Sequence, residues 1–139
     1  MGLAVQVNTD GGARGNPGPA AIGAVVRAAG TSEMEVLAEI SRTIGETTNN
    51  VAEYAAVIAG LEAARDLGAD DVRLESDSEL LIKQLKGAYK VRAAHLQPLH
   101  RRCRELLSGF GTVELVHVRR ERNVEADALV NQALDASLM

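Results

Sequence analysis

Hydrophobic and polar residues alternate along the first third of the chain in the pattern of half-buried β-strands. Residues 3–9, LAVQVNT, place an apolar side chain at every second position. Short apolar runs between turn-forming residues continue the pattern further along the chain. The sequence predicts strands over 3–9, 21–28, 34–44, 72–76 and 112–118. Because only residues 30–33 separate the second strand from the third, we expect a hairpin there.

The remaining segments have the composition and periodicity of helices, which we predict over 49–68, 76–87, 93–110 and 124–138. The first of them is rich in alanine and ends at Gly68, a common helix terminator. The second opens with Ser76 and Glu79, the spacing of a capping box. In the third, Pro98 is tolerated if the helix begins near Gln97.

The predicted elements follow one another in the order β-β-β-α-β-α-α-β-α. Three consecutive strands favour an antiparallel meander, whereas the later alternation favours parallel strands joined by crossover helices. The sequence therefore predicts an α/β fold with helices packed against a mixed sheet. A length of 139 residues fits a single domain over 1–139, and whether further domains follow in a longer protein stays open.

Composition narrows the setting in which the protein works. No apolar run is long enough to span a membrane, and no signal peptide is visible at the N-terminus. Cys103 is the single cysteine, which excludes an internal disulfide and fits a reducing compartment. We therefore expect a cytoplasmic protein without a membrane partner, and a monomer.

The charge distribution is uneven, although the net charge is only −4. Residues 80–104 contain seven lysines and arginines and no acid, leaving eight basic against 19 acidic residues elsewhere. Such a segment could bind a polyanion or could be a solvated helix face. With two tyrosines, one phenylalanine and no tryptophan, extensive base stacking is disfavoured, and with it a dedicated single-strand binder.

Four acids occupy positions that the hydrophobic pattern does not explain. Asp10 ends the first strand, Asp77 follows the strand at 72–76, Glu53 lies on the apolar stripe of its helix, and Asp127 borders another such stripe. Singly, each has an ordinary explanation as a turn residue or a helix N-terminal acid. Gathered at one edge of a sheet, they would repel one another unless hard cations such as Mg²⁺ or Mn²⁺ neutralised them. Two such ions are a known device for phosphodiester displacement.

Turn-forming residues follow Asp10 in the segment NTDGGARGNPGPA, residues 8–20. They allow either a phosphate-cradling loop or a rigid shelf beside a metal-binding acid. The segment lacks both the Gly-x-Gly-x-x-Gly pattern and a Lys-Ser/Thr pair after the glycines, so a nucleotide-binding loop is the weaker interpretation.

Four segments, TDGGARGNPGPA, TTNNVAEYAAVIAGL, LESDSELLIKQL and RNVEADALVN, resemble type 1 ribonuclease H over about residues 3–135. The resemblance implies the ribonuclease H-like fold, a five-stranded mixed sheet with its first three strands antiparallel and helices on both faces. It implies an endonuclease that hydrolyses the RNA strand of RNA–DNA hybrids, leaving 5′-phosphate and 3′-hydroxyl ends. The catalytic residues, holding two Mg²⁺ or Mn²⁺ ions, would be Asp10, Glu53, Asp77 and Asp127.

The same resemblance implies contacts to the hybrid. Gly11, Gly12 and Asn16 would lie against the RNA backbone and its 2′-hydroxyls. Thr48 would help to seat a DNA phosphate, and Asn49 and Asn50 would enter the minor groove. The basic segment adds Arg101 and Arg102 as salt-sensitive contacts to the nucleic acid.

Two departures from the family pattern matter. Many members carry a histidine before the last helix, where this chain has RRERN, so Arg119, Arg120 and Glu121 are candidates to replace it, and His117 is expected to be structural. No tryptophan-bearing basic helix is present, which indicates the compact form of the family. Cleavage of double-stranded RNA, as in some compact relatives, stays open. The rival interpretations are a hybrid-binding domain with an inactive site and another nuclease of the same fold, such as a junction resolvase or integrase.

Overall fold

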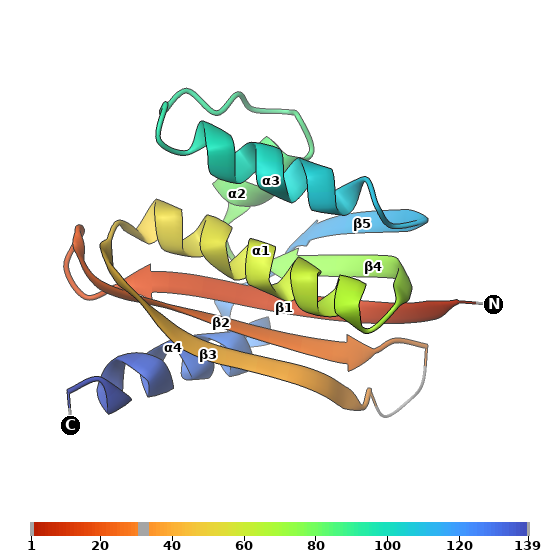
Figure 1. Ribbon diagram of the computed structural model, residues 1–139, viewed down its shortest axis with the longest axis horizontal. Helices are drawn as coiled ribbons and strands as arrows, with labels where there is room; N and C mark the ends of the chain where they lie inside the picture. Colours follow the sequence, from red (N-terminus) through yellow and green to blue (C-terminus); the bar gives the residue numbers. More distant parts are fainter. Residues whose placement is uncertain (1, 31–33, 139) are drawn as a thin grey trace.

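The computed structural model describes residues 2–30 and 34–138, and its elements follow the predicted order (Figure 1). They are β1 (Leu3–Ala13), β2 (Gly18–Ala28), β3 (Val36–Thr47), α1 (Asn49–Asp66), β4 (Ala69–Ser76), α2 (Glu79–Leu85), α3 (Gln97–Leu107), β5 (Thr112–His117), the 3₁₀ turn η1 (Arg120–Arg122) and α4 (Val124–Ala136). The predicted hairpin connection lies largely outside the described residues, because 31–33 are not among them. Among the described helices, none is both long and apolar enough to cross a membrane.

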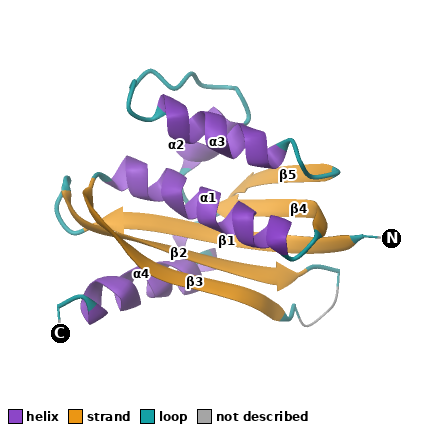
Figure 2. Cartoon of the chain, in the orientation of Figure 1, coloured by secondary structure: helices purple, strands orange, loops and turns teal. Residues whose placement is uncertain are grey.

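The five strands form one mixed sheet in the order β3-β2-β1-β4-β5. β1 pairs antiparallel with β2, and β2 with β3, whereas β4 runs parallel to both β1 and β5. Helices α1 and α3 lie on one side of the sheet and α4 on the other (Figures 1 and 2). The predicted fold class, with an antiparallel meander followed by parallel crossovers, is thus confirmed.

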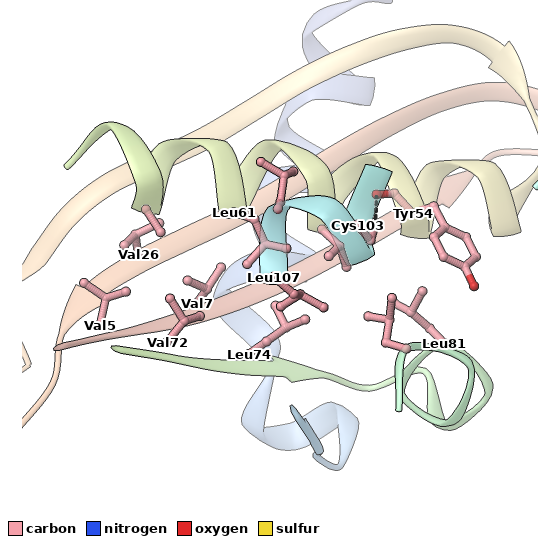
Figure 3. Packing of buried hydrophobic residues seen from close by; sticks show 14 of the residues in the cluster. Val5, Val7, Val26, Tyr54, Leu61, Val72, Leu74, Leu81, Cys103 and Leu107 are labelled. Carbon is pink, nitrogen blue, oxygen red and sulfur yellow. Dashed lines mark hydrogen bonds between the residues drawn. The ribbon is translucent and has the colours of Figure 1, made fainter. Parts of the chain in front are cut away.

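The main hydrophobic core lies between the sheet, α1 and α3 (Figure 3). Val5 and Val7 of β1 meet Leu61 of α1 there, and Leu107 of α3 closes the layer from outside. Gly60 lets α1 lie close to the sheet, because a Cβ at that position would be 2.8 Å from the Val7 side chain. This close packing holds α1 at a fixed height above β1.

A second, smaller cluster packs α4 against the opposite face of the sheet, where Val130 and Leu134 meet Ala21 of β2. Cys103 of α3 is fully buried in the main core, and burial raises the pKa of its thiol to about 12. The single cysteine is therefore a packing residue, as the helical pattern around it indicates.

Several predicted boundaries were wrong, mostly by two to four residues: β2 begins at Gly18 and not at 21, β3 covers 36–47 and not 34–44, and β4 begins at Ala69 and not at 72. Two differences matter for the site. β1 continues through Gly11 and Gly12 to Ala13, because these residues pair with β2 instead of forming a loop. The cap of α2 is Ser78, whose Oγ accepts a hydrogen bond from the Leu81 amide at 3.3 Å, and not Ser76, which ends β4. The third helix, predicted over 93–110, covers only Gln97–Leu107, with Pro98 in its first turn, where a proline is tolerated. Residues 86–96 between α2 and α3 contain no helix, which agrees with the compact form of the fold.

Candidate active site

Four carboxylates from four separate elements line one open cleft of about 460 Å³. Asp10 lies in β1 and Asp77 directly after β4, so the ends of two parallel strands supply one carboxylate each. Glu53 comes from the N-terminal part of α1, and Asp127 from the first turn of α4 on the other side of the sheet. All four side chains are half-buried. The structure therefore brings together the four acids that the sequence singles out.

A glycine makes the approach of α1 to this edge of β1 geometrically feasible. A Cβ on Gly11 would collide with the backbone carbonyl of Ala52 and would lie 2.6 Å from the amide nitrogen of Glu53. Only a residue without a side chain fits there, so Gly11 admits the helix that carries Glu53 beside the strand that carries Asp10. At Gly12 the nearest side-chain atom, on Val130 of α4, would be at an ordinary 3.8 Å.

The electrostatics of the cleft are those of crowded carboxylates. Burial, followed by the charge of Asp77, a hydrogen bond and charge from Asp127 and the charge of Glu53, raises the pKa of Asp10 to about 8. Burial also raises the pKa of Glu53, opposed by a hydrogen bond from Ser78 and reinforced by the charge of Asp77. In the absence of cations, Asp10 therefore holds a proton at neutral pH, because ionising it would add another negative charge to the cleft.

The pKa of Asp77 is raised by burial, and the positive charge that acts on it most strongly is that of Arg120. The charge of that guanidinium opposes the shift, as does His117 to a smaller extent, while Asp127 reinforces it. The cleft thus has a basic rim next to Asp77 and an acidic centre around Asp10.

The donor set suits a hard divalent cation, because carboxylate oxygens are the ligands that Mg²⁺ and Mn²⁺ prefer. Within the described ranges, however, no three of these side chains already gather around one point closely enough to hold an ion. Burial and the neighbouring acids raise the pKa of Asp10, and a cation bound among these carboxylates would offset their repulsion. The chemical types of the residues in the cleft therefore suit a divalent metal ion.

The asparagines expected to contact substrate brace the turn beside the cleft. Asn16 Oδ1 accepts a hydrogen bond from the Asn49 amide at 3.1 Å, and Asn49 Oδ1 accepts one from the Ala13 amide at 2.8 Å. Thr48 caps α1 by accepting a hydrogen bond from the Val51 amide at 3.2 Å. Of these side chains, Asn49 also lines the cleft. These bonds fix the β1–β2 turn against the start of α1.

Asn50 is exposed at the N-terminus of α1 and does not line the cleft. The basic residues divide between two places. Arg119 and Arg120 line the cleft, whereas Glu121, from the same turn, does not. Arg101 and Arg102 lie on α3, away from the lining of the cleft. Arg102 pairs with Glu62 and Glu105 at 3.3 Å each, so its charge is already partly compensated within the protein.

Sequence reasoning missed several residues that line the cleft, and the polar ones are Arg14, Ser78, His117 and Asn131. His117 was expected to be structural, yet it is the last residue of β5, is exposed and lines the cleft. The register between β4 and β5 explains the position of His117, because His117 pairs with Ser76, the residue directly before Asp77. Ser78 was overlooked because Ser76 gave the better capping pattern, and it serves both as the cap of α2 and as a hydrogen-bond partner of Glu53.

Known proteins with similar sequences point in one direction. Residues 8–133 match the family described as Reverse transcriptase-like. The chain is 49% identical over 131 residues to ribonuclease HI of Halobacterium salinarum, covering 94% of this chain and 64% of that protein. It is 45% identical over 135 residues to bifunctional protein Rv2228c of Mycobacterium tuberculosis, covering 97% of this chain and 36% of that protein. The chain therefore spans less than two thirds of the length of either relative.

Solved structures agree with the sequence matches. The N-terminal RNase H domain of Rv2228c from Mycobacterium tuberculosis superposes with a TM-score of 0.91 at 45% identity, covering 96% of this chain and all of that one. LC11-RNase H1 in complex with an RNA/DNA hybrid gives a TM-score of 0.88 at 41% identity, covering 97% and 99% of the two chains. Both the matched family and these structures extend over the segments that carry the four acids. The chain therefore belongs to the type 1 ribonuclease H family.

Proposed function

We propose that this chain is an endonuclease that hydrolyses the RNA strand of RNA–DNA hybrids. The observation that carries the proposal is the convergence of four carboxylates from β1, β4, α1 and α4 in one open cleft. The similarity to LC11-RNase H1, which has been solved with an RNA/DNA hybrid, supports the choice of substrate. Because one chain supplies all four acids, we propose that residues 1–139 act as one functional domain and as a monomer.

The carboxylates of Asp10, Glu53, Asp77 and Asp127 would hold two Mg²⁺ or Mn²⁺ ions. When bound, such ions lower the pKa of an attacking water and stabilise the charge on the leaving 3′ oxygen, which gives 5′-phosphate and 3′-hydroxyl products. The protein orients the carboxylates on two strand ends and two helix starts, all rigid elements. Asp10 must release its proton to become a ligand, so cation binding is expected to release protons at neutral pH.

Arg120 is the residue that we propose in place of the family histidine. It lines the cleft and is the principal positive charge acting on Asp77, whereas Glu121 faces elsewhere. Its guanidinium would attract the phosphate that enters beside Asp77 and would favour the developing negative charge there. Arg119 adds positive charge to the same rim of the cleft, which His117 also lines.

Contacts to the duplex are proposed around the acids and on α3. Gly11, Gly12 and Asn49 line the cleft, and Asn16 and Thr48 shape the turn next to it, where an RNA backbone would pass. Exposed Asn50, next to Asn49 in α1, would reach the minor groove, and Arg101 and Arg102 of α3 would lie near a phosphate backbone. These are contacts to sugar and phosphate, so weak sequence preference is expected.

A substrate panel tests the proposal directly. End-labelled RNA–DNA hybrid, duplex RNA, duplex DNA, single strands and a four-way DNA junction are incubated with Mg²⁺ or Mn²⁺. We expect cleavage within the RNA strand of the hybrid and its loss in Asp10→Asn and Asp77→Asn. Cleavage of the junction would favour a resolvase, and binding of the hybrid without cleavage would favour an inactive site. Activity that persists in both variants would refute the assignment of these acids. The duplex RNA arm decides whether that substrate is also cut.

A further inference from the structure

A buried polar cluster, Asn8, Glu75 and Asn123, lies next to the acid cleft on the α4 side of the sheet. These residues are 5%, 8% and 1% exposed. The Nδ2 of Asn8 donates hydrogen bonds to Glu75 Oε1 and to Asn123 Oδ1, each at 3.1 Å. The Nδ2 of Asn123 donates to the backbone carbonyl of Thr9 at 2.9 Å. The cluster therefore joins β1, β4 and the start of α4.

Each member precedes a proposed metal ligand by two or four positions: Asn8 before Asp10, Glu75 before Asp77, and Asn123 before Asp127. In both strands the spacing is two residues, which places the cluster member and the acid on the same face. Asn8 and Glu75 are also direct partners in the parallel ladder between β1 and β4. A shift at the cluster is therefore transmitted to the acids through a single intervening residue in each strand.

The side chain of Asn123 does not cap the helix that follows it. Asparagine at the first position of a helix normally accepts a hydrogen bond from a helix amide, a contact worth about 1 kcal/mol. Here α4 has no side-chain cap, because both polar atoms of the Asn123 side chain bond to β1: Oδ1 accepts from Asn8, and Nδ2 donates to the Thr9 carbonyl. The backbone oxygen of Asn123 accepts the amide of Asp127 at 3.1 Å, and its backbone nitrogen donates to the carbonyl of Arg120 at 2.9 Å. Asn123 thus ties the turn of Arg120 and the first turn of α4 to the sheet.

The cluster has one hydrogen-bonding arrangement. Gln6 Nε2 donates to Asn8 Oδ1 at 3.0 Å, and Arg73 Nε donates to the other oxygen of Glu75 at 2.8 Å. Turning the Asn8 amide over would direct its oxygen at the Glu75 carboxylate and at the oxygen of Asn123. Among the described residues, no buried side-chain nitrogen or oxygen lacks a partner. A fully satisfied buried network of this kind specifies a unique geometry.

We propose that Asn8, Glu75 and Asn123 are positioning residues for the metal-binding carboxylates. They hold the strand ends of Asp10 and Asp77 and the first turn of α4 in a fixed relation without touching the substrate. The inference rests on the proposed function for its catalytic consequence, but its structural part concerns the affinity of the carboxylates for a cation.

The test compares wild-type protein with Asn123→Ala and Asn8→Ala. The matched control is Tyr54→Phe, which removes another buried side-chain hydrogen bond, from the Tyr54 hydroxyl to Gln84 at 2.5 Å, on the opposite face of the sheet. Titration with Mn²⁺ alone, followed by electron paramagnetic resonance of the free ion, measures cation affinity. Hydrolysis of a labelled hybrid in Mg²⁺ gives kcat and KM, and urea unfolding gives the folded fraction of each variant.

We expect Asn123→Ala to weaken Mn²⁺ binding and to lower kcat by about 10- to 100-fold each, with KM within about twofold of wild type. Asn8→Ala should show a smaller loss of the same kind, since Asn123 keeps its bond to Thr9. If Asn123→Ala does not fold, the Mn²⁺ affinity and kcat of Asn8→Ala test the inference. Tyr54→Phe should lose stability but neither Mn²⁺ affinity nor kcat. Equal Mn²⁺ affinities in all variants, or a loss confined to KM, would overturn the inference. A wild-type protein that binds Mn²⁺ but cuts no hybrid would refute the proposed function alone.

Discussion

Asp10→Asn should stabilise the metal-free protein, although it removes a proposed catalytic group. The pKa of Asp10 is raised from 3.8 to about 8, first by burial and then by the neighbouring acids. Between these values the folded protein keeps a proton that the unfolded chain has released. The free energy of unfolding therefore falls by about 1.4 kcal/mol for each pH unit over which this difference holds.

The sign and the pH window follow from this linkage. Below pH 4 the carboxyl is protonated in both states and contributes nothing, and its destabilising effect grows as the pH rises through neutrality. At pH 7 the effect amounts to about 4 kcal/mol as an upper limit. Water and side chains rearrange around the charge, so we expect a measured gain of about 1–3 kcal/mol for the neutral, isosteric asparagine.

Urea unfolding in EDTA at pH 5 and pH 8, followed by circular dichroism, measures the difference. The advantage of Asp10→Asn over wild type should be small at pH 5 and larger at pH 8. Asp66→Asn provides the control, because Asp66 is exposed and its replacement should change stability by less than about 0.5 kcal/mol. An Asp10→Asn protein that is no more stable than wild type at pH 8, or an advantage independent of pH, would show that the carboxylates are not crowded.

Further outcomes follow from the same geometry. Mg²⁺ should raise the melting temperature of wild-type protein through preferential binding to the folded state, and the rise should be smaller in Asp10→Asn; equal rises would place the ion elsewhere. Gly11→Ala should lower the free energy of unfolding by about 1–3 kcal/mol, since its Cβ meets the Ala52 carbonyl, whereas Gly12→Ala should change it by less than about 1 kcal/mol in the same urea assay. Arg101→Glu should reduce the log–log salt dependence of hybrid binding by about one unit or more, and an unchanged slope would mean that α3 presents only a solvated face.

The pattern of apolar residues predicted the sheet because its central strands β1 and β2 are covered by α1 on one face and α4 on the other. It could not predict where β1 ends, since Gly11 and Gly12 carry no side chains to show a face. Their place in the strand is set by pairing with Ile22 and Ala21 of β2. The end of β4 at Ser76 was predicted correctly, but the cap of α2 was misplaced. Ser76 belongs to the sheet because of neighbours distant in sequence, which leaves Ser78 to cap α2.

For the site, residue types and spacing predicted which acids meet, and the resemblance to the family supplied their roles. Tertiary partners were beyond reach. Arg102 looked free to bind phosphate, but α3 packs beside α1 and brings Glu62, forty positions away, within 3.3 Å of its guanidinium. Likewise, Asn123 has the sequence position of an ordinary helix cap, and only the packing of α4 against the sheet shows that its side chain reaches Thr9.

The acid cleft and the polar cluster beside it have opposite effects on the stability of the fold. Four half-buried carboxylates in one cleft oppose one another when no cation is bound, which raises the pKa of Asp10, and this repulsion acts against the pairing and packing of the elements that carry them. Asn8 and Asn123 supply that connection with neutral hydrogen bonds, which do not weaken when the charge in the cleft changes. A fold that holds its carboxylates in place before a cation arrives loses less free energy to reorganisation when the cation binds. If the cleft binds cations as proposed, replacing Asn8 or Asn123 should therefore weaken that binding more than replacing a buried polar residue away from the cleft.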